Sequence, residues 1–445
     1  MMTTIEGFTG HPSVRTAVRE AQHASAGKEI SDIVDANKLQ YVDLVMEGGG
    51  VLGIALTGYT YVLEQAGIRF LGIGGTSAGS INALMIAALG PPEEAKSEKL
   101  LRVLADMPMA SFIDGDHDAR DFSHALLKKV GVMKLLWKAL QIADNLTDDL
   151  GLNPGEKFFE WLTVQLKRAD IRTNADLLNR LRTVPKGLRL RPGRTDADLK
   201  DDDTHGRLIM VAADITTETK VEFPRMAELY WANPDEVNPA CFARASMSIP
   251  FFFHPFRINN CPNDTARWKK LACYEGTLPD SVMFMDGGIM SNFPINLFHQ
   301  PYRVPTAPTF GAKIGVDRQH PAAITKPSQL LGAVFDAARH TLDFDFISQN
   351  PDYTHLVKML QTGPHHWLNF NMEDNDKIDL FARGAQAAKE FLCKFDWDQY
   401  KNIRKGIADA FLVDSEKGRG SRKGERVTFS TTFSGVATRP GLPVT

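Results

Sequence analysis

A serine with two flanking glycines is the first group in this sequence that could do chemistry. It stands in Gly75-Thr76-Ser77-Ala78-Gly79, where an apolar run ends and a helix-compatible run begins. A chain that changes from strand to helix there must turn sharply, and Gly75 and Gly79 permit a turn that a Cβ would obstruct. The Ser77 hydroxyl then projects at the helix N-terminus, as in a nucleophile elbow. A serine that only caps the helix is the alternative interpretation.

A second glycine cluster lies one strand and one helix upstream of this serine. The strand-like residues 41–46 lead into Glu47-Gly48-Gly49-Gly50-Val51-Leu52-Gly53, and an amphipathic helix pattern follows. A phosphate-binding loop is one interpretation, but the Lys-Ser/Thr pair of a P-loop and the G-x-G-x-x-G spacing are both missing. The other is an oxyanion hole, in which backbone amides point at an oxygen that develops negative charge. A serine one β-α-β step downstream favours the oxyanion hole.

The third group is an aspartate that could act as the base. A serine hydroxyl needs a base within about 2.6–3.2 Å. Asp286 closes a strand-like run at 282–285 and precedes Gly287 and Gly288, which favour a tight loop. It could accept the Ser77 proton directly. A triad in the order Ser, Asp, His is the alternative, and the histidines downstream of the elbow that it could use include His299, His340 and His355.

Together these three blocks, in this order, resemble the motifs of the patatin-like phospholipase family. Three further segments are similar as well: Gly151-Leu152-Asn153-Pro154-Gly155, Val211-Ala212-Ala213-Asp214 and Ala245-Ser246-Met247-Ser248-Ile249-Pro250. The resemblance implies a three-layer α/β/α fold related to the cytosolic phospholipase A2 catalytic domain. It also implies a Ser77–Asp286 dyad without histidine, oxyanion amides from Gly49, Gly50 and Val51, and acyl esters of glycerolipids as substrates.

One position departs from the family pattern. Many members carry Arg or Lys where this sequence has Leu52, and that cation is thought to support the oxyanion region or to meet a lipid headgroup. Members that act on neutral lipids can have an apolar residue there. Leu52 therefore puts a preference for anionic phospholipid in doubt.

Composition narrows the class of protein. Hydrophobic residues at 43% and charged residues at 24% of 445 describe a soluble globular chain. The formal charge of −3 gives no reason to expect a nucleic-acid partner. The four cysteines lack C-x-x-C spacing, so neither a zinc site nor a disulfide framework is indicated. The proposed chemistry requires no metal or cofactor.

The expected location follows from two missing patterns. The N-terminal residues lack an apolar signal segment, and no run approaches the ~18 apolar residues of a membrane span. We expect a cytoplasmic protein that contacts a membrane surface transiently to reach its lipid substrate, with export by a leaderless route left open. The sequence indicates neither an activator nor an oligomeric state.

The elements that must position these groups alternate between strand and helix patterns, which predicts an α/β fold with a mostly parallel central sheet. We expect an N-terminal extension at 1–38, a catalytic domain at 39–413 and a poorly ordered tail at 414–445. Strands are expected at 207–213, 282–285 and 311–316. Amphipathic helices are expected through Leu331, Val334, Phe335, Ala338 and Leu342, and through Ile378, Phe381, Ala385, Ala388 and Leu392.

A helical insertion is expected at about 97–206, ending in a surface loop at 183–206. Apolar residues recur at helical spacing through Leu126, Val130, Met133, Trp137 and Leu140, and through Phe158, Trp161, Leu162 and Leu166. These helices either pack on the sheet or form a cap whose side chains line an acyl channel. The phenylalanines of 251–256 are likewise either core or a rim that touches lipid.

The expected activity is that of a lipid acyl hydrolase of the phospholipase A or lysophospholipase type, working through an acyl-enzyme on Ser77 with Asp286 as the base. Two rivals stay open. One is a Ser-His-Asp esterase or thioesterase that acts on soluble acyl groups. The other is a non-catalytic lipid-sensing protein that keeps the fold.

Overall fold

The computed structural model describes residues 4–115, 150–194, 199, 201–300, 303–314, 321, 324–325 and 327–420. The helix predicted through Leu126 to Leu140 lies outside these residues, as does most of the predicted tail.

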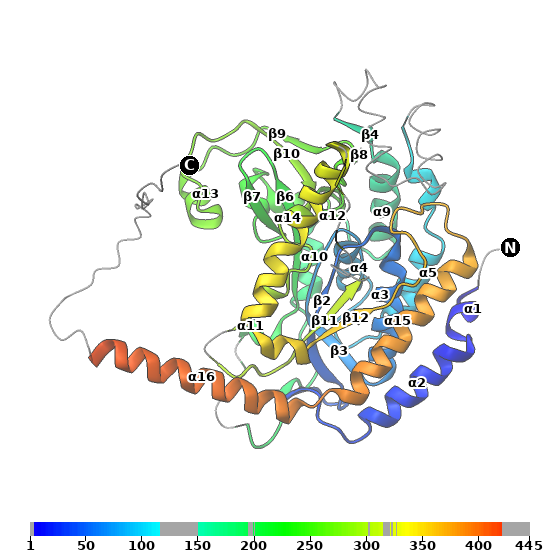
Figure 1. Cartoon of the computed structure of the whole chain (residues 1–445), viewed down its shortest axis with the longest axis vertical. Coiled ribbons are helices and arrows are strands. Elements are labelled where there is room, and N and C mark those ends of the chain that lie inside the picture. The colour runs from blue at the N-terminus through cyan, green and yellow to red at the C-terminus, as the bar shows by residue number, and fades with distance from the viewer. Residues whose placement is uncertain are drawn as a thin grey trace, which may run out of the picture.

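Ten strands of the described residues form one sheet whose main path runs β12-β11-β2-β3-β6-β10-β9 (Figure 1). Along this path the strands are β12 (Val357–Leu360), β11 (Thr309–Ile314), β2 (Gln40–Met46), β3 (Ile68–Thr76), β6 (Arg207–Asp214), β10 (Ser281–Asp286) and β9 (Phe256–Asn259). The first five are parallel to one another, whereas β10 and β9 join in antiparallel pairs. Three short strands pair off this path: β1 (Ile33–Val34), β5 (Arg189–Leu190) and β7 (Thr219–Phe223). The predicted α/β fold with a mostly parallel central sheet is confirmed.

The strands β2 and β3 are buried almost throughout, as parallel strands covered on both faces must be. The helix α3 (Gly53–Gln65) connects them and is itself buried on nearly every side. It packs against α15 (Asp374–Lys394) at backbone distance, because a Cβ on Gly58 would lie 2.0 Å from the carbonyl oxygen of Phe381. The apolar stripe predicted for α15 is therefore a core contact.

Helices flank the sheet. Figure 1 shows α2 (Pro12–Ser25), α3 and α15 gathered on one side of the molecule and α14 (Pro327–Gln349) on the other. The helix α4 (Ala78–Ala88) follows β3 and packs on β3 and β6. The helix α14 packs on η5 (Gly287–Ile289), the turn after β10.

The stripe predicted for α14 is only partly a packing face. Val334 and Leu342, which were expected on its apolar side, are more than half exposed. The side chains of Leu331 and Phe335 lie outside the described part.

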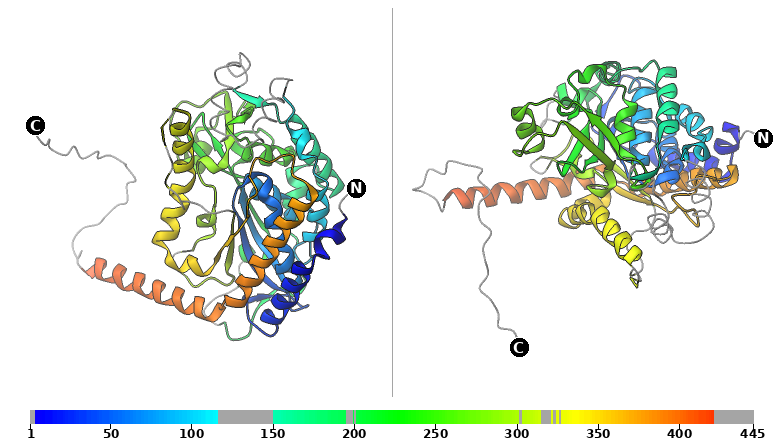
Figure 2. Two further views of the ribbon diagram at one scale, coloured as in Figure 1. Left: turned by 45° about the vertical axis from the view of Figure 1, so that its right-hand side comes forward. Right: turned by 90° about the horizontal axis from the view of Figure 1, so that it is seen from above.

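Both ends of the described part of the chain contain helices. The expected N-terminal extension contains α1 (Ile5–Thr9) and α2, whose buried face packs on α15, and β1 joins the sheet. At the other end α16 (Trp397–Gly420) continues past the predicted boundary at 413 and projects away from the rest of the protein (Figure 2). The extension is thus integrated into the domain.

The described part of the insertion holds short elements around one longer helix. These are α5 (Ser97–Ala105), η2 (Met109–Phe112), β4 (Gly151–Asn153), α9 (Glu156–Arg168), α10 (Asn174–Leu181), β5 and α11 (Asp201–Thr204). The helix predicted around Phe158 is α9, which buries Phe158, Leu162 and Leu166. The segment 183–206, expected as a loop, contains β5 and α11. The strand β4 pairs with β8 (Phe251–Phe253) in a separate two-stranded sheet.

The remaining elements are short. They are η1 (Gly50–Leu52), η3 (Ala227–Leu229), η4 (Pro234–Glu236), α12 (Ala240–Ser246), α13 (Thr265–Ala272), η6 (Ile295–Phe298) and η7 (Pro351–His355).

Candidate active site

Two strands bring Ser77 and Asp286 together by meeting end to end. Thr76, the last residue of β3, pairs with Val211 of β6, and Asp286, the last residue of β10, pairs with Ala212. Because β7 occupies the other edge of β6, β3 and β10 share one edge and run toward each other along it. Ser77 therefore leaves the sheet beside Asp286.

The backbone of Ser77 has the strained geometry of a nucleophile elbow. Its φ is +52° and its ψ is −119°, in a region that a residue with a Cβ rarely adopts. A Cβ on Gly75 would lie 2.3 Å from the carbonyl carbon of Gly79, and one on Gly79 would lie 2.2 Å from the carbonyl oxygen of Met46. The two flanking glycines are thus required by close backbone approach.

Two serines of one segment hold the two residues in place. The Ser246 hydroxyl accepts the Ser77 backbone N–H at 2.9 Å and donates to the carbonyl oxygen of Val211 at 2.6 Å. Two residues later, the carbonyl oxygen of Ser248 accepts the backbone N–H of Asp286 at 2.7 Å. Sequence reasoning noted this segment only as a supporting motif and assigned it no role.

The carboxylate of Asp286 is buried, with 6% of the residue exposed. Burial raises its pKa above the usual value, whereas the positive charge of Arg339 and hydrogen bonding from Ser77 and Gly288 oppose that rise. The Gly288 N–H donates to Asp286 Oδ1 at 2.7 Å. A raised pKa brings an aspartate closer to the range in which a general base works best.

The glycine loop passes directly beside the serine, since a Cβ on Gly48 would lie 3.1 Å from Ser77 Cβ. The amides of Gly49 and Gly50 make no hydrogen bond to another described residue. The third predicted amide differs, because the Val51 N–H already donates to the carbonyl oxygen of Trp367 at 3.0 Å. Of the three predicted amides, those of Gly49 and Gly50 are therefore the ones without a hydrogen-bond partner among the described residues.

A small apolar cavity of about 50 Å³ opens at Ser77. Its lining comprises Gly50, Val51, Ser77, Ala78, Ile81, Met107, Met109, Phe112, Phe158, Met247, Ile249 and Phe370. Four of these side chains come from the insertion, which therefore supplies one wall of the cavity as well as core contacts. Ser77 is the one polar side chain among the described residues of this lining.

Comparison with known proteins bears on the same residues. The sequence profile described as "Patatin-like phospholipase" matches residues 44–299, more than half of the chain, and includes all three motif blocks. The chain belongs to the patatin-like phospholipase family. That membership supports hydrolysis of lipid acyl esters in general.

Individual relatives of this patatin-like chain are distant. It is 28% identical over 356 residues to the uncharacterized protein YqhO of Bacillus subtilis, a match that covers 79% of this chain and 98% of YqhO. Among solved structures, VipD of Legionella pneumophila is 14% identical with a TM-score of 0.37, and the match covers 82% of this chain and 70% of VipD. The matched chain in the structure of the ExoU–SpcU complex of Pseudomonas aeruginosa is also 14% identical, with a TM-score of 0.30. That match covers 86% of this chain and 60% of the other.

A segment between β12 and α15 covers the patatin-like site. The carbonyl oxygen of Trp367 accepts the hydrogen bond from the Val51 N–H. It also packs closely on Gly50, because a Cβ on Gly50 would lie 2.2 Å from this oxygen. Phe370 stacks on Phe252, with ring centroids 5.0 Å apart, and reaches the cavity. No sequence pattern had pointed to Trp367 or Phe370.

Two residues bear on the cation that the family resemblance led us to expect at position 52. Leu52 is buried, with 6% exposed, and packs in the core rather than at the cavity. Arg339 of α14 instead reaches the loop, and its Nη2 donates to the carbonyl oxygen of Gly48 at 2.8 Å. Sequence reasoning had not singled out Arg339.

No histidine lines the described part of the Ser77 cavity. His299 Nδ1 lies 2.9 Å from the hydroxyl of Tyr353, and burial lowers the pKa of His299. His355 is exposed, and the His254 backbone N–H donates to Asn153. The side chain of His340 lies outside the described part.

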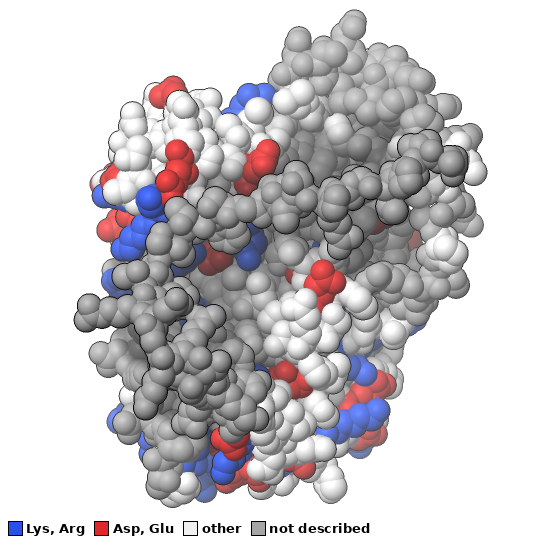
Figure 3. Space-filling model, turned by 60° about the vertical axis from the view of Figure 1, so that its left-hand side comes forward, with Lys and Arg blue, Asp and Glu red and all other residues white. Residues whose placement is uncertain are grey.

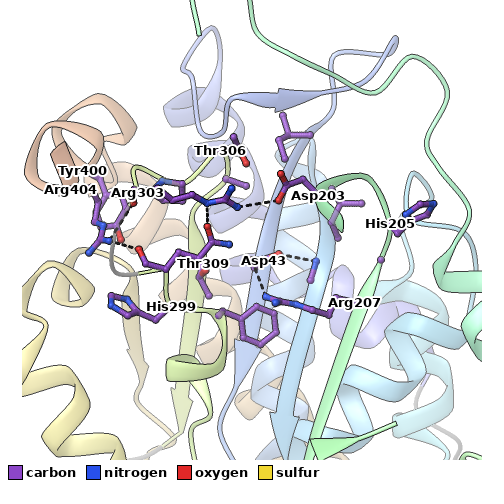
Figure 4. A pocket seen from close by; sticks show the side chains of 18 of the residues that line it. Asp43, Asp203, His205, Arg207, His299, Arg303, Thr306, Thr309, Tyr400 and Arg404 are labelled. Atoms are coloured by element: carbon purple, nitrogen blue, oxygen red, sulfur yellow. Dashed lines mark hydrogen bonds and ion pairs between the residues drawn. The ribbon is translucent and has the colours of Figure 1, made fainter. Parts of the chain in front are cut away.

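A larger cavity of about 510 Å³ lies at the other end of the parallel strands (Figure 4). Its charged side chains face one another: Asp43 lies 3.9 Å from Arg207, and Asp203 lies 3.3 Å from Arg303. Arg404 of α16 donates to the carbonyl oxygens of Gln300 and Arg303. These contacts tie α16 to the domain, and we interpret the cavity as part of a structural network rather than as the site of hydrolysis.

The described residues contain no group of three or more His, Cys, Asp or Glu side chains placed to hold a metal ion. None of the helices searched within them is long and apolar enough to span a bilayer. Figure 3 shows acidic and basic side chains interspersed on the face in view, with no continuous basic patch among the described residues.

Proposed function

We propose that this chain hydrolyses fatty acyl esters of glycerolipids, in the manner of a phospholipase A or lysophospholipase, through a Ser77–Asp286 dyad and an acyl-enzyme. One observation carries the proposal. The strained Ser77 leaves β3 at the point where β10 delivers Asp286, and an apolar cavity opens at the same serine.

In the first half of the reaction Asp286 takes the proton of the Ser77 hydroxyl as Ser77 Oγ attacks the ester carbonyl carbon. The carbonyl oxygen becomes an oxyanion and accepts hydrogen bonds from the backbone N–H groups of Gly49 and Gly50. When the tetrahedral intermediate collapses, the bond to the leaving alcohol breaks. Asp286 returns the proton to that alcohol, and the acyl group stays on Ser77 as an ester.

In the second half Asp286 takes a proton from a water molecule that attacks the acyl ester. Collapse of this second intermediate breaks the bond to Ser77 Oγ, and Asp286 returns the proton to Ser77. The fatty acid leaves and the dyad is restored. The lack of a histidine in the described cavity lining supports the dyad over a triad.

The apolar lining of the cavity favours a hydrocarbon substrate, but the cavity is small. A volume of about 50 Å³ is below the several hundred Å³ of typical ligand sites. A long acyl chain therefore requires Phe370 or the methionines of the wall to move. Because position 52 is an apolar leucine, both neutral lipids and phospholipids stay open as substrates.

Access to such a substrate requires contact with a lipid surface, and α14 is well placed for it. Leu330, Val334 and Leu342 are spaced by four and eight residues, so they lie on one stripe of the helix. They are 53%, 57% and 58% exposed. The same helix carries Arg339 to the glycine loop.

The proposal is tested by incubating the purified chain with a mixed lipid extract and identifying the products by mass spectrometry, with Ser77→Ala alongside. We expect free fatty acid and lysolipid or diglyceride from the wild type only, and labelling of Ser77 by a fluorophosphonate probe. Folded wild type that neither releases fatty acid nor takes up the probe would instead support the non-catalytic rival.

A further inference from the structure

A cation reaches the catalytic loop from an unexpected element. Arg339 Nη2 donates to the carbonyl oxygen of Gly48 at 2.8 Å, although the two residues are 291 positions apart. The guanidinium also lies 5.8 Å from the ring centroid of Trp367, the residue whose carbonyl oxygen holds Val51. Arg339 thus contacts both segments that enclose the proposed oxyanion hole.

The hydrogen bond to Gly48 controls the direction of an amide. In a trans peptide the C=O of one residue and the N–H of the next point to opposite sides. Holding the Gly48 carbonyl toward Arg339 therefore aims the Gly49 N–H the other way, away from the helix. Asn292 Nδ2 supports the same carbonyl at 3.2 Å.

The same side chain lies close to the base. A Cβ built on Gly288 would lie 2.9 Å from Asp286 Oδ1 and 3.5 Å from Arg339 Nε, so both groups flank one point. Arg339 Nε is buried and has no hydrogen-bond partner among the described residues. The charge of Arg339 opposes the rise that burial causes in the pKa of Asp286.

The helix that carries Arg339 is anchored beside the site. Asp343, one turn further along α14, accepts hydrogen bonds from Ser291 Oγ at 2.9 Å and from the backbone N–H of Phe293 at 2.6 Å. Asp343 is itself only 3% exposed. This contact fixes α14 against the chain that follows Asp286, and it sets the position of Arg339.

The inference rests on the proposed function. We propose that Arg339 is the positioning cation of this active site, which orients the Gly48–Gly49 peptide for the oxyanion and lies beside the Asp286 carboxylate. Arg339 lies on α14 rather than on the glycine loop, and it provides there the positive charge that the apolar Leu52 does not.

Other charged groups lie on the elements that pack against β10 and η5. They include Asp214 of β6, Arg244 of α12, Arg257 of β9 and Asp343 of α14. Arg339 is the charged group that perturbs the pKa of Asp286. Asp286 must be ionised to accept a proton, so loss of Arg339 should move the acid limb of kcat/KM to higher pH.

The experiment compares Arg339→Met and Arg339→Lys with wild type on a soluble short-chain acyl ester, which has no headgroup for Arg339 to bind. We expect Arg339→Met to lower kcat at least tenfold with little change in KM, and to shift the acid limb upward. Arg339→Lys should keep the limb near its wild-type position and recover part of kcat. Arg15→Met, which removes a surface arginine with 64% side-chain exposure, is the control and should match wild type.

Two results would overturn the positioning role. One is folded Arg339→Met with kcat within twofold of wild type and an unmoved acid limb. The other is a loss confined to phospholipid vesicles, which would make Arg339 a headgroup contact. If Arg339→Met does not fold by thermal melting, Arg339→Gln carries the same comparison. Active wild type beside inactive Ser77→Ala would keep the proposed function even if Arg339 fails, whereas inactive wild type overturns both.

Discussion

The hydroxyl of Ser246 accepts the backbone N–H of Ser77 at 2.9 Å across 169 residues of sequence. The same hydroxyl donates to the carbonyl oxygen of Val211, the residue paired with Thr76 at the end of β3. A positive φ at a non-glycine residue persists only where its surroundings hold it. Ser246 is therefore part of what keeps the nucleophile in its elbow.

Replacing Ser246 with alanine should damage both stability and catalysis. The change leaves the Ser77 N–H and one acceptor unpaired in a buried place, which costs about 1–3 kcal/mol. Urea unfolding should show that loss, and kcat should fall because the elbow relaxes. Ser348→Ala, which removes an exposed hydroxyl of α14, is the control. Wild-type stability and kcat in Ser246→Ala would refute the role.

Gly50→Ala should lower stability and activity more than Gly67→Ala, although both glycines have a positive φ. Gly50 has a φ of +55°, and its added Cβ would lie 2.2 Å from the carbonyl oxygen of Trp367. Gly67 has a φ of +82° with nothing within 4 Å of such a Cβ, so Gly67→Ala isolates the backbone strain of about 1–2 kcal/mol. We expect Gly50→Ala to exceed that loss in unfolding and to lose activity, while Gly67→Ala stays active. Equal losses in the two variants would argue against a tight contact at Trp367.

The exposed stripe of α14 should control access to lipid. Val334→Asp combined with Leu342→Asp should reduce binding to lipid vesicles and hydrolysis of vesicle lipid several-fold, because two charges oppose insertion of the stripe. Hydrolysis of a soluble ester should stay near wild type. Val184→Asp changes a similarly exposed valine, at 46%, elsewhere on the surface and should have no effect. Equal vesicle binding by wild type and the double variant would exclude this stripe.

The pH profile should report the burial of Asp286. Its raised pKa means that protonation sets in at a higher pH than for an ordinary aspartate. The base works only when ionised, so kcat/KM should fall as the pH drops through that raised value. A profile of kcat/KM on a soluble ester measures the limb, and a limb within the ordinary aspartate range would contradict the burial argument.

The sequence predicted the motif blocks and the central strands because they depend on local patterns. Glycines at 75 and 79 signal close backbone approach wherever the chain goes next. The buried face of α2, which carries Val14, Ala17 and Ala21, was not singled out because the partner helix α15 lies more than 350 residues further along the chain. Long-range partners could not be found this way.

Those partners are contacts rather than patterns. Ser246, Arg339 and the carbonyl oxygen of Trp367 act on residues more than 160 positions away. A backbone carbonyl leaves no mark in the residue type that carries it, so the bond that occupies the Val51 amide had no sequence signal. The helix that carries Arg339 was predicted from its apolar residues. That pattern does not show that the Arg339 side chain points toward the glycine loop.

The most direct test of the dyad is kcat/KM of Asp286→Asn, measured with Ser77→Ala and the double variant. The amide is nearly isosteric with the carboxylate but cannot accept the Ser77 proton, so we predict a loss close to that of Ser77→Ala, on the order of 10⁴–10⁶. The double variant should lose no more, because the two residues act as one unit. The His254, His299, His340 and His355 alanine variants should each keep most activity. Folded Asp286→Asn with a tenth of wild-type kcat/KM, or a histidine variant as inactive as Ser77→Ala, would contradict the dyad.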